Sequence, residues 1–490
     1  MVIALTHDSL GWYAAFQAKD SRFDGRFFVG VSSTGIYCRP ICRARLPKRE
    51  NCTFFSAAAQ AEQAGYRPCL LCRPEIAPGS SRIDSTSNLA QRGARLLEES
   101  CGAEQSVETL AASLGCTARH LRRAFQQEYQ VSPLQYLQTC RLLLSKSLLT
   151  DSSLSVLEVS MACGFGSLRR FQDLFRKRYR LSPTALRRQA ASKKQRADCI
   201  TLQLAYRPPY LWERLLGFLA PRAIAGVELI RDNTYLRTVH LIGRNDAHFY
   251  GWIRVENRPE THALAVTIAD TLLPVLPQVL ARVKNLFDLH CDPEVIAQGL
   301  SSMNDIQPKL YALGTRLPGS FDAFEMAVRA VLGQQITVKA ANTLAARLVA
   351  AYGVPLQTGI HGLSHVFPSP RAILDLGAPI QDYLCPIGVL SARAKTIGAL
   401  AEALDGGEIH FGASAQPEAE MKKLLAIPGI GPWSAQYIAM RAMGWPDAFL
   451  ETDAGIKKAL APRTGKEMLA VAEAWRPWRS YATLSLWNSL

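Results

Sequence analysis

Two closely spaced cysteine pairs are the residues of this chain best suited to chemistry. Three residues separate Cys38 from Cys42, and two separate Cys69 from Cys72. Thiolate pairs at this spacing, with room between them for a strand and a helix, predict a tetrahedral zinc site with four sulfur ligands. Spacing alone favours a zinc ion that only holds a small domain together. Basic side chains crowd these cysteines, however, which suits a site that faces phosphate: Arg39, Arg43, Arg45, Lys48, Arg49, Arg67 and Arg73.

A second chemical candidate lies near the carboxyl end. The sequence Pro428-Gly429-Ile430-Gly431 precedes a helical pattern, and such a turn exposes backbone N–H groups that can bind a phosphate. Asp453 follows 22 residues after Gly431. Taken alone, the turn is typical of an ordinary connection between helices, and a single Asp is more often a surface carboxylate or a helix cap. Neither feature alone therefore establishes a site.

Length and charge limit the possible architectures and partners. A chain of 490 residues, 48% hydrophobic and 20% charged, should form three or four domains with substantial cores. The net charge of +15 favours a nucleic acid over a membrane as partner. No run resembles a signal peptide or a membrane span, so we expect a cytoplasmic protein. The eight other cysteines are then reduced thiols rather than disulfides.

Composition divides the chain into regions. A Pro-, Gly- and Ser-rich stretch at 76–88 and a polar stretch at 190–199 are predicted linkers. Residues 88–190 have helical periodicity throughout, and they carry more than half of the excess positive charge. Residues 200–285 contain alternating strand patterns, and residues 286–490 are mostly helical. The predicted fold class is multidomain α+β.

The helical region contains two copies of one unit. In each copy a short helix ends at a glycine, Gly115 or Gly164, and a second helix closes in Ser-Pro. This is helix-turn-helix geometry, in which the second helix enters the major groove of DNA. One basic helix face could be an ordinary solvated surface, but two tandem copies are more specific. The predicted DNA-binding residues on these faces are Arg119, Arg122, Arg123, Arg169 and Arg170.

These motifs resemble two known families in the amino-terminal part of the chain. TGIYCRPICRAR and GYRPCLLCRP make residues 1–80 similar to the zinc domain of Ada methylation-response proteins. Residues 88–190 resemble the paired helix-turn-helix module of AraC-type regulators. The Ada resemblance implies Zn²⁺ held by Cys38, Cys42, Cys69 and Cys72. It also implies that Cys38 accepts a methyl group from a DNA methylphosphotriester, with Arg39, Arg43 and Arg45 near the DNA.

The carboxyl-terminal part resembles a third family. RPPYLWERLLGFLAPRAI, FDAFEMAVRAVLGQQIT, IPGIGPWSAQYIAMRAMG and WRPWRSYATLSLW match AlkA-type 3-methyladenine glycosylases of the helix-hairpin-helix superfamily. The resemblance implies an antiparallel sheet subdomain at 200–285 and a helix-hairpin-helix domain at 286–490. It implies that Asp453 is the catalytic carboxylate and that Pro428, Gly429 and Gly431 grip phosphate. It places four aromatic residues around a flipped base, although each could simply be core: Phe218, Trp433, Tyr437 and Trp487.

Two positions depart from related patterns. Gln335 matches the apolar wedge that fills the gap left by a flipped base, and a polar residue there puts this assignment in doubt. Trp433 stands where bifunctional members carry a Schiff-base lysine, so we expect an enzyme that stops at base removal.

The combined prediction is a DNA alkylation repair enzyme that also regulates transcription. Its expected activities are single-turnover methyl transfer to Cys38, which activates promoter binding, and excision of alkylated purines. Expected partners are methylated DNA, promoter DNA and RNA polymerase, and we expect a monomer in the cytoplasm, associated with the nucleoid. The alternatives are a non-enzymatic DNA-binding regulator with a structural zinc, and a glycosylase with lyase activity.

Overall fold

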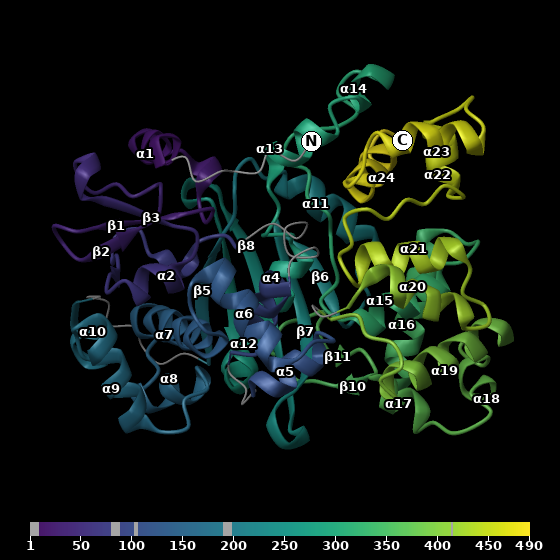
Figure 1. Cartoon of the computed structure of the whole chain (residues 1–490). Coiled ribbons are helices and arrows are strands. Elements are labelled where there is room, and N and C mark those ends of the chain that lie inside the picture. Colours follow the sequence, from purple (N-terminus) through teal and green to yellow (C-terminus); the bar gives the residue numbers. More distant parts are fainter. Residues whose placement is uncertain (1–8, 80–88, 102–105, 190–197, 413–414) are drawn as a thin grey trace. The chain divides into compact units, whose positions relative to one another are not determined.

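The computed structural model describes residues 9–79, 89–101, 106–189, 198–412 and 415–490, which form two compact units (Figure 1). The first unit comprises residues 1–208, 243–245 and 258–280, and the second comprises 209–242, 246–257 and 281–490. Most residues of the two predicted linkers, 80–88 and 190–197, lie outside the described residues. The prediction of a multidomain α+β chain is confirmed. The strands predicted within 200–285 are divided between the two units.

The first unit begins with a small sheet that carries the cysteines. Strand β1 (Phe28–Val31) pairs antiparallel with β2 (Ile36–Cys38) and β3 (Cys52–Phe55), and β2 pairs parallel with β4 (Arg67–Pro68). Helices α1 (Ser9–Ala18) and α2 (Ala58–Gln63) accompany this sheet. Aromatic residues of this region pack together, with the Trp12 and Phe27 rings stacked at 5.0 Å. The sheet therefore brings the end of β2 beside the end of β4.

Seven helices follow among the described residues of the first unit. They are α4 (Leu89–Glu99), α5 (Val107–Ser113), α6 (Ala118–Tyr129), α7 (Pro133–Asp151), α8 (Val156–Ala162), α9 (Leu168–Tyr179) and α10 (Pro183–Gln189). Gly115 and Gly164 adopt φ of +68° and +77°, which lets the chain turn between the two helices of each pair. Ser132 caps α7, and the side chain of Gln135 returns to the Ser132 N–H. An antiparallel pair of strands, β5 (Cys199–Ala205) and β9 (Ala263–Ala269), also belongs to this unit.

The second unit combines an antiparallel meander with a helical core. The strands are β6 (Glu228–Arg231), β7 (Thr234–Ile242) and β8 (His248–Arg258). The longer helices are α11 (Trp212–Leu219), α15 (Ala323–Leu332), α16 (Val338–Tyr352), α19 (Ser391–Asp405), α20 (Pro417–Ala426), α21 (Pro432–Arg441), α23 (Gly465–Glu473) and α24 (Arg479–Trp487). The shorter elements are α13 (Pro293–Gly299), α14 (Met303–Ile306), α17 (Pro370–Leu374), α18 (Gln381–Leu384), α22 (Ala454–Ala459) and the pair β10 (Val354–Pro355) and β11 (His365–Val366). Helix α12 (Leu276–Leu286) begins in residues of the first unit and ends in residues of the second.

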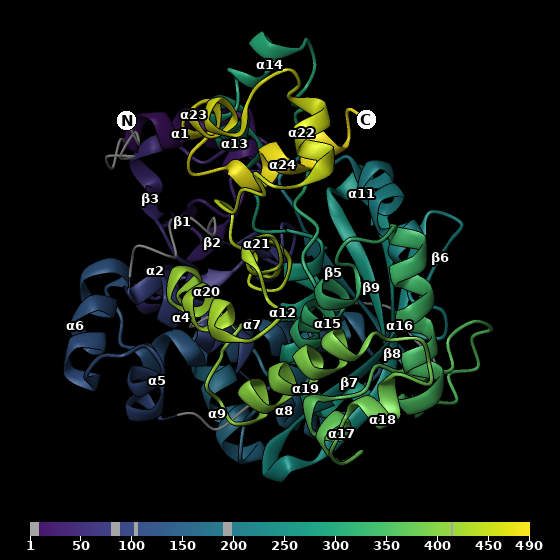
Figure 2. The same cartoon turned by 90° about the vertical axis from the view of Figure 1, so that its right-hand side faces the viewer.

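Apolar faces of several helices meet in the main core of the second unit. Helix α15 packs against α16, α19 and α21, and α20 packs against α21. Figure 2 shows this group in green and yellow-green. The core includes residues from α15, α19 and α21 that are fully buried, such as Val328, Ile397 and Ile438. This packing fixes the two helices between which the predicted phosphate-gripping turn lies.

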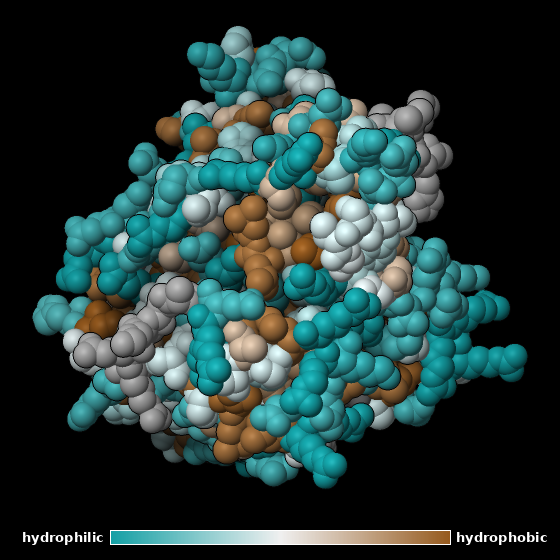
Figure 3. Space-filling model, turned by 90° about the vertical axis from the view of Figure 1, so that its left-hand side faces the viewer, coloured by the Kyte–Doolittle hydropathy of each residue, from teal (hydrophilic) through white to brown (hydrophobic). Residues whose placement is uncertain are grey.

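Hydrophilic side chains cover most of the face shown in Figure 3, with smaller apolar patches between them. Such a surface is expected of a chain in which charged residues are one fifth of the total. Among the described residues, no helix has both the length and the apolar character that a membrane span requires.

Candidate functional sites

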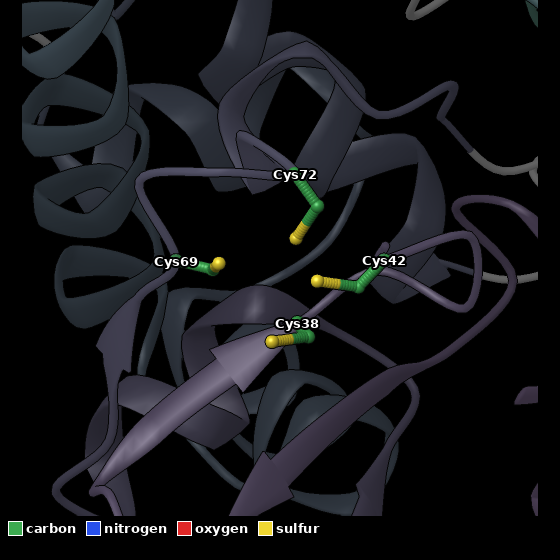
Figure 4. Close-up of side chains that lie close together, drawn as sticks. All are labelled: Cys38, Cys42, Cys69 and Cys72. Carbon is green, nitrogen blue, oxygen red and sulfur yellow. The ribbon is translucent and has the colours of Figure 1, made fainter. Parts of the chain in front are cut away.

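The four predicted zinc ligands come together in the first unit. Cys38 ends β2, Cys69 follows β4, and the sulfur atoms of all four cysteines lie within 4.8 Å of one another (Figure 4). In a tetrahedral site with Zn–S bonds of about 2.3 Å, neighbouring sulfurs lie about 3.8 Å apart. All four side chains are nearly buried. The donor set and the spacing therefore fit Zn²⁺, and the chain has this cofactor site.

The four thiols influence each other strongly. When no metal is bound, hydrogen bonds among the four thiols raise the pKa of Cys38 and lower that of Cys42. Backbone N–H groups also reach the cluster: that of Arg39 donates to Cys72 Sγ at 3.3 Å. The polypeptide thus orients the sulfurs through its own hydrogen bonds.

Arginines near the cysteines differ in exposure. Arg39 is only 3% exposed: its guanidinium forms an ion pair with Asp24 and donates to the Cys72 carbonyl at 3.1 Å. In this structure it braces the cluster and is buried away from the surface where a phosphate would bind. Arg43 and Arg45 are exposed in the loop that follows Cys42. They remain the predicted phosphate contacts of this site.

A buried carboxylate, Glu62, joins the zinc region to the helix-turn-helix helices. It accepts hydrogen bonds from Tyr37 (3.2 Å), Thr139 (3.3 Å) and Tyr179 (3.4 Å). It also pairs with Arg178 of α9, N to O 3.5 Å. Tyr37 precedes Cys38, and Tyr179 ends α9. One side chain therefore contacts both the strand of the first cysteine and a predicted DNA-reading helix.

Burial of Glu62 predicts a pH-dependent stability. Desolvation raises the pKa of Glu62 to about 7, although Arg178 and the three hydroxyl groups oppose this shift. A carboxyl group whose pKa is raised by folding stabilises fully at low pH, and the contribution is lost as the pH rises from about 4.5 to 7. We expect this loss to be roughly 3 kcal/mol in the free energy of unfolding of the first unit.

Denaturant unfolding of the zinc-loaded protein between pH 5 and 8 measures this contribution. Glu62→Gln cannot ionise, so its stability relative to wild type should improve as the pH rises to about 7 and should then level off. Glu50→Gln is the matched control, because the Glu50 side chain is 73% exposed. Parallel pH profiles for wild type and Glu62→Gln would contradict the assignment.

Both predicted DNA-reading helices have one buried and one exposed face. Leu121, Phe125 and Tyr129 of α6 and Phe171, Phe175 and Tyr179 of α9 are buried. The five arginines predicted to bind DNA are exposed on the same two helices: Arg119, Arg122, Arg123, Arg169 and Arg170. Arg122 pairs with Glu108 at 2.8 Å, and this exposed ion pair costs little to exchange for a phosphate.

A cavity of about 420 Å³ in the second unit contains the predicted catalytic carboxylate. Asp453 caps α22, and its Oδ1 accepts hydrogen bonds from the Ile456 N–H (3.1 Å) and from Trp487 Nε1 (2.9 Å). Its Oδ2 accepts a hydrogen bond from Trp433 Nε1 at 2.9 Å. The rings of Trp433 and Tyr437 stack at 5.1 Å. Three of the four predicted aromatic residues therefore line one cavity with Asp453.

The fourth aromatic residue, Phe218, lies behind this cavity. Its side chain is 8% exposed and is not part of the lining. The guanidinium of Arg222 covers the ring, with Cζ 3.8 Å from its centroid, and that of Arg441 lies at 5.0 Å. Both arginines line the cavity, and the sequence analysis missed both. Arg222 follows Phe218 by four residues, a helical spacing that could have signalled the contact.

The predicted phosphate-gripping turn is held tightly. Gly429 has φ of +92°, and a Cβ there would lie 2.0 Å from Thr396 Oγ1, so only glycine fits. Thr396 donates to the Pro428 carbonyl at 2.9 Å, and Gln334 Nε2 donates to the Gly429 carbonyl at 2.8 Å. Gly431 is the N-cap of α21. The exposed turn thus presents the start of a helix, and Gln334 is an anchor that the sequence analysis did not identify.

Gln335 lies exposed between α15 and α16 in a left-handed conformation, φ +56°. Its neighbour Ile336 is 36% exposed and lines the cavity. An apolar side chain therefore lies next to the polar residue that was aligned with the wedge.

Comparison with known families agrees with this arrangement. Family profiles match in four places: "Metal binding domain of Ada" at 11–75, "Helix-turn-helix domain" at 110–189, "AlkA N-terminal domain" at 201–322 and "HhH-GPD superfamily base excision DNA repair protein" at 328–465. Among solved structures, a 3-methyladenine DNA-glycosylase from Archaeoglobus fulgidus is 19% identical, with a TM-score of 0.48, over 58% of this chain and 96% of that one.

Curated relatives extend the similarity to the whole chain. "DNA-3-methyladenine glycosylase 2" of Escherichia coli is 35% identical over 58% of this chain and 95% of its own length. The "Probable bifunctional transcriptional activator/DNA repair enzyme AlkA" of Mycobacterium tuberculosis is 37% identical over 487 residues, which cover 98% of this chain and 96% of that protein. The identity extends over nearly the full length of both proteins, so the chain belongs to the family of bifunctional transcriptional activator and DNA repair enzymes AlkA.

Proposed function

We propose that this protein repairs alkylated DNA by two separate reactions and regulates transcription with the product of one of them. The observation that carries the proposal is the presence in one chain of a buried four-cysteine cluster and a cavity with a clamped carboxylate. The test is to incubate the zinc-loaded protein with methylated duplex DNA. Intact protein mass should rise by one methyl group, and free alkylated purines should appear. If neither product forms, the protein is a non-enzymatic regulator.

The first proposed reaction moves a methyl group from DNA to Cys38. The new S–CH₃ bond forms as the CH₃–O bond of the methylphosphotriester breaks, and the phosphodiester leaves as an anion. Bound Zn²⁺ keeps the four sulfurs as thiolates at neutral pH. The triester is uncharged, so it does not repel the anionic cluster. Exposed Arg43 and Arg45 then hold the neighbouring phosphates.

This methylation is proposed to increase affinity for a promoter. Four thiolates on Zn²⁺ carry a net charge of about −2, and methylation of one reduces it to about −1, so repulsion of DNA falls. Glu62 contacts both Tyr37, which precedes Cys38, and Arg178 of α9, and these contacts support an effect of the cluster's charge on DNA bound by that helix. We expect the methylated protein to bind its promoter about tenfold more tightly than the unmodified protein at low salt.

Titrations of methylated and unmodified protein on one promoter fragment, at several salt concentrations, measure this effect. Binding of both forms should weaken steeply with salt because Lys and Arg displace counterions. The ratio of the two affinities should shrink as salt screens the cluster. Equal affinities of the two forms at low salt would rule out the electrostatic switch.

The second proposed reaction removes an alkylated purine and leaves the strand intact. Asp453 stabilises positive charge that develops at the sugar, and it orients water. Residues lining the cavity, all within the described part of the chain, include no lysine. This supports base release without a Schiff base. Pro428, Gly429 and Gly431 are proposed to hold phosphate, and Gln335 and Ile336 to enter the gap left by the flipped base.

We propose that the methylated protein works as a monomer and contacts RNA polymerase at the promoter, in association with the nucleoid. The exposed basic faces of α6 and α9 support promoter contact.

A further inference from the structure

The wall of the glycosylase cavity next to Phe218 is formed by arginine. Arg222 Cζ lies 3.8 Å from the centroid of the Phe218 ring, which is the distance of a guanidinium stacked on it. Arg222 Nη1 donates to the Phe218 carbonyl at 2.8 Å, which holds the side chain over the ring. The cavity is lined by Arg222 and Arg441 but not by Phe218. A base in this cavity would meet guanidinium groups before it met the phenyl ring.

Two of the three acidic residues that line the cavity are paired with other arginines. Glu325 pairs with Arg237 at 2.8 Å, and Arg329 pairs with both Glu325 and Glu228. The two carboxylates are therefore neutralised by two other arginines. The Asp453 carboxylate keeps its negative charge, and the two indole N–H groups hold it in place. Among the described residues, Arg222 and Arg441 contact carbonyl and hydroxyl oxygens and the Phe218 ring rather than a carboxylate, so they supply positive charge next to the Phe218 side of the cavity.

The same positive charges affect the pKa of Tyr437. Burial alone would raise the pKa of Tyr437, but Arg441, Arg222 and Arg329 together lower it below its ordinary value. Arg441 Nη1 donates to the Tyr437 hydroxyl at 2.9 Å, and its other nitrogens donate to the Pro318 and Gly319 carbonyls. The hydroxyl oxygen is thus an acceptor for Arg441, which directs its own O–H toward another acceptor.

We propose that Arg222 is a specificity-determining residue that disfavours permanently cationic bases relative to neutral purines with a carbonyl acceptor. This inference rests on the proposed glycosylase function. A methylated purine with a fixed positive charge is repelled by a guanidinium stacked against it, whereas a neutral base stacks on the same plane without that cost. The Tyr437 hydroxyl can in addition donate to the carbonyl of a neutral base. Both effects lower the rate at which a cationic base is released relative to the rate for a neutral base.

Single-turnover release of 7-methylguanine, a cationic base in the nucleoside, and of hypoxanthine, a neutral one, tests the role of Arg222. The duplexes should be identical apart from the lesion. Arg222→Gln removes the charge and should raise the ratio of the single-turnover rate constant for 7-methylguanine to that for hypoxanthine by about tenfold. Arg222→Lys keeps a charge and should stay near the wild-type ratio. Arg214→Gln is the matched control, an exposed arginine of α11 that does not line this cavity.

The outcomes separate this inference from the function on which it rests. If wild type releases both bases and Arg222→Gln leaves their ratio unchanged while remaining folded by thermal melting, Arg222 has no role in selection. If wild type releases only the cationic base, the proposed role of Arg222 in selection is also wrong. If wild type releases neither base, the proposed glycosylase function itself is wrong.

Discussion

Replacement of Asp453 by Asn is expected to reduce the release of 3-methyladenine by about a thousandfold or more. The carboxylate lies in a cavity where a negative charge can stabilise the developing positive charge at the sugar, and Asn removes that charge without changing the size of the side chain. An amide oxygen can still accept the Ile456 N–H, so α22 keeps its cap. Only one of the two indole N–H groups loses its acceptor, which costs about 1 kcal/mol of stability.

DNA affinity should distinguish loss of catalysis from loss of the fold. The turn at Pro428 to Gly431 is anchored by Thr396 and Gln334 rather than by Asp453, so binding to undamaged duplex should stay within about twofold of wild type. Glu451→Gln, two residues away and outside the cavity lining, is the control that should retain full base release. Full activity of Asp453→Asn would remove this residue from the catalytic role.

The same assay decides whether the enzyme cleaves the strand. Wild type should leave abasic sites that break only on treatment with alkali or heat, because Trp433 and the other lining residues offer no amine to the sugar. Borohydride trapping of a covalent complex between wild type and DNA would establish the lyase alternative.

The sequence predicted the chemistry of these sites better than their electrostatics. The four zinc ligands could be predicted because the cysteines of each pair are close in sequence. Asp453 could be predicted to lie in a site because it follows the Pro428 to Gly431 turn in the order of a family motif. Arg39 shows the limit: its motif suggests a phosphate contact, but burial depends on Asp24, which lies fifteen residues earlier and on another segment. Phe218 shows the same limit, since only the folded chain reveals that Arg222 and Arg441 come between this ring and the cavity. Hydrophobic periodicity cannot indicate which side of a ring is covered.

The division of the strand-rich region between the two compact units could not be predicted from the alternation of apolar and polar residues either. Alternation within 200–285 identifies strands such as β5 and β7, but it does not say which strands share a compact unit. Pairing partners are set by contacts far along the chain, and sequence alternation fixes only the face on which each side chain lies. For the same reason the Glu62 network, whose partners come from three separate segments, has no sequence signature.

Peptide mapping after reaction with phosphotriester-containing DNA is expected to find the methyl group on Cys38 and on no other cysteine. The backbone N–H of Arg39 donates to Cys72 Sγ at 3.3 Å. A hydrogen bond to a thiolate stabilises its charge and lowers its nucleophilicity. We therefore expect Cys72 to be a poorer acceptor, and the match to the metal binding domain of Ada supports Cys38 as the proposed one.

Substitution of Cys38 should abolish methyl transfer and leave the glycosylase intact. Cys38→Ser removes the acceptor sulfur, so the intact mass should not change after incubation with methylated DNA. Release of alkylated purines should continue, because Asp453 belongs to the other compact unit. Loss of one ligand also weakens Zn²⁺ binding, so the metal content of the variant must be measured. Cys52→Ser, which changes a cysteine outside the cluster, is the control that should still accept one methyl group. Methyl on Cys69 or Cys72 of the wild type, with Cys38 unmodified, would show that Cys38 is not the acceptor.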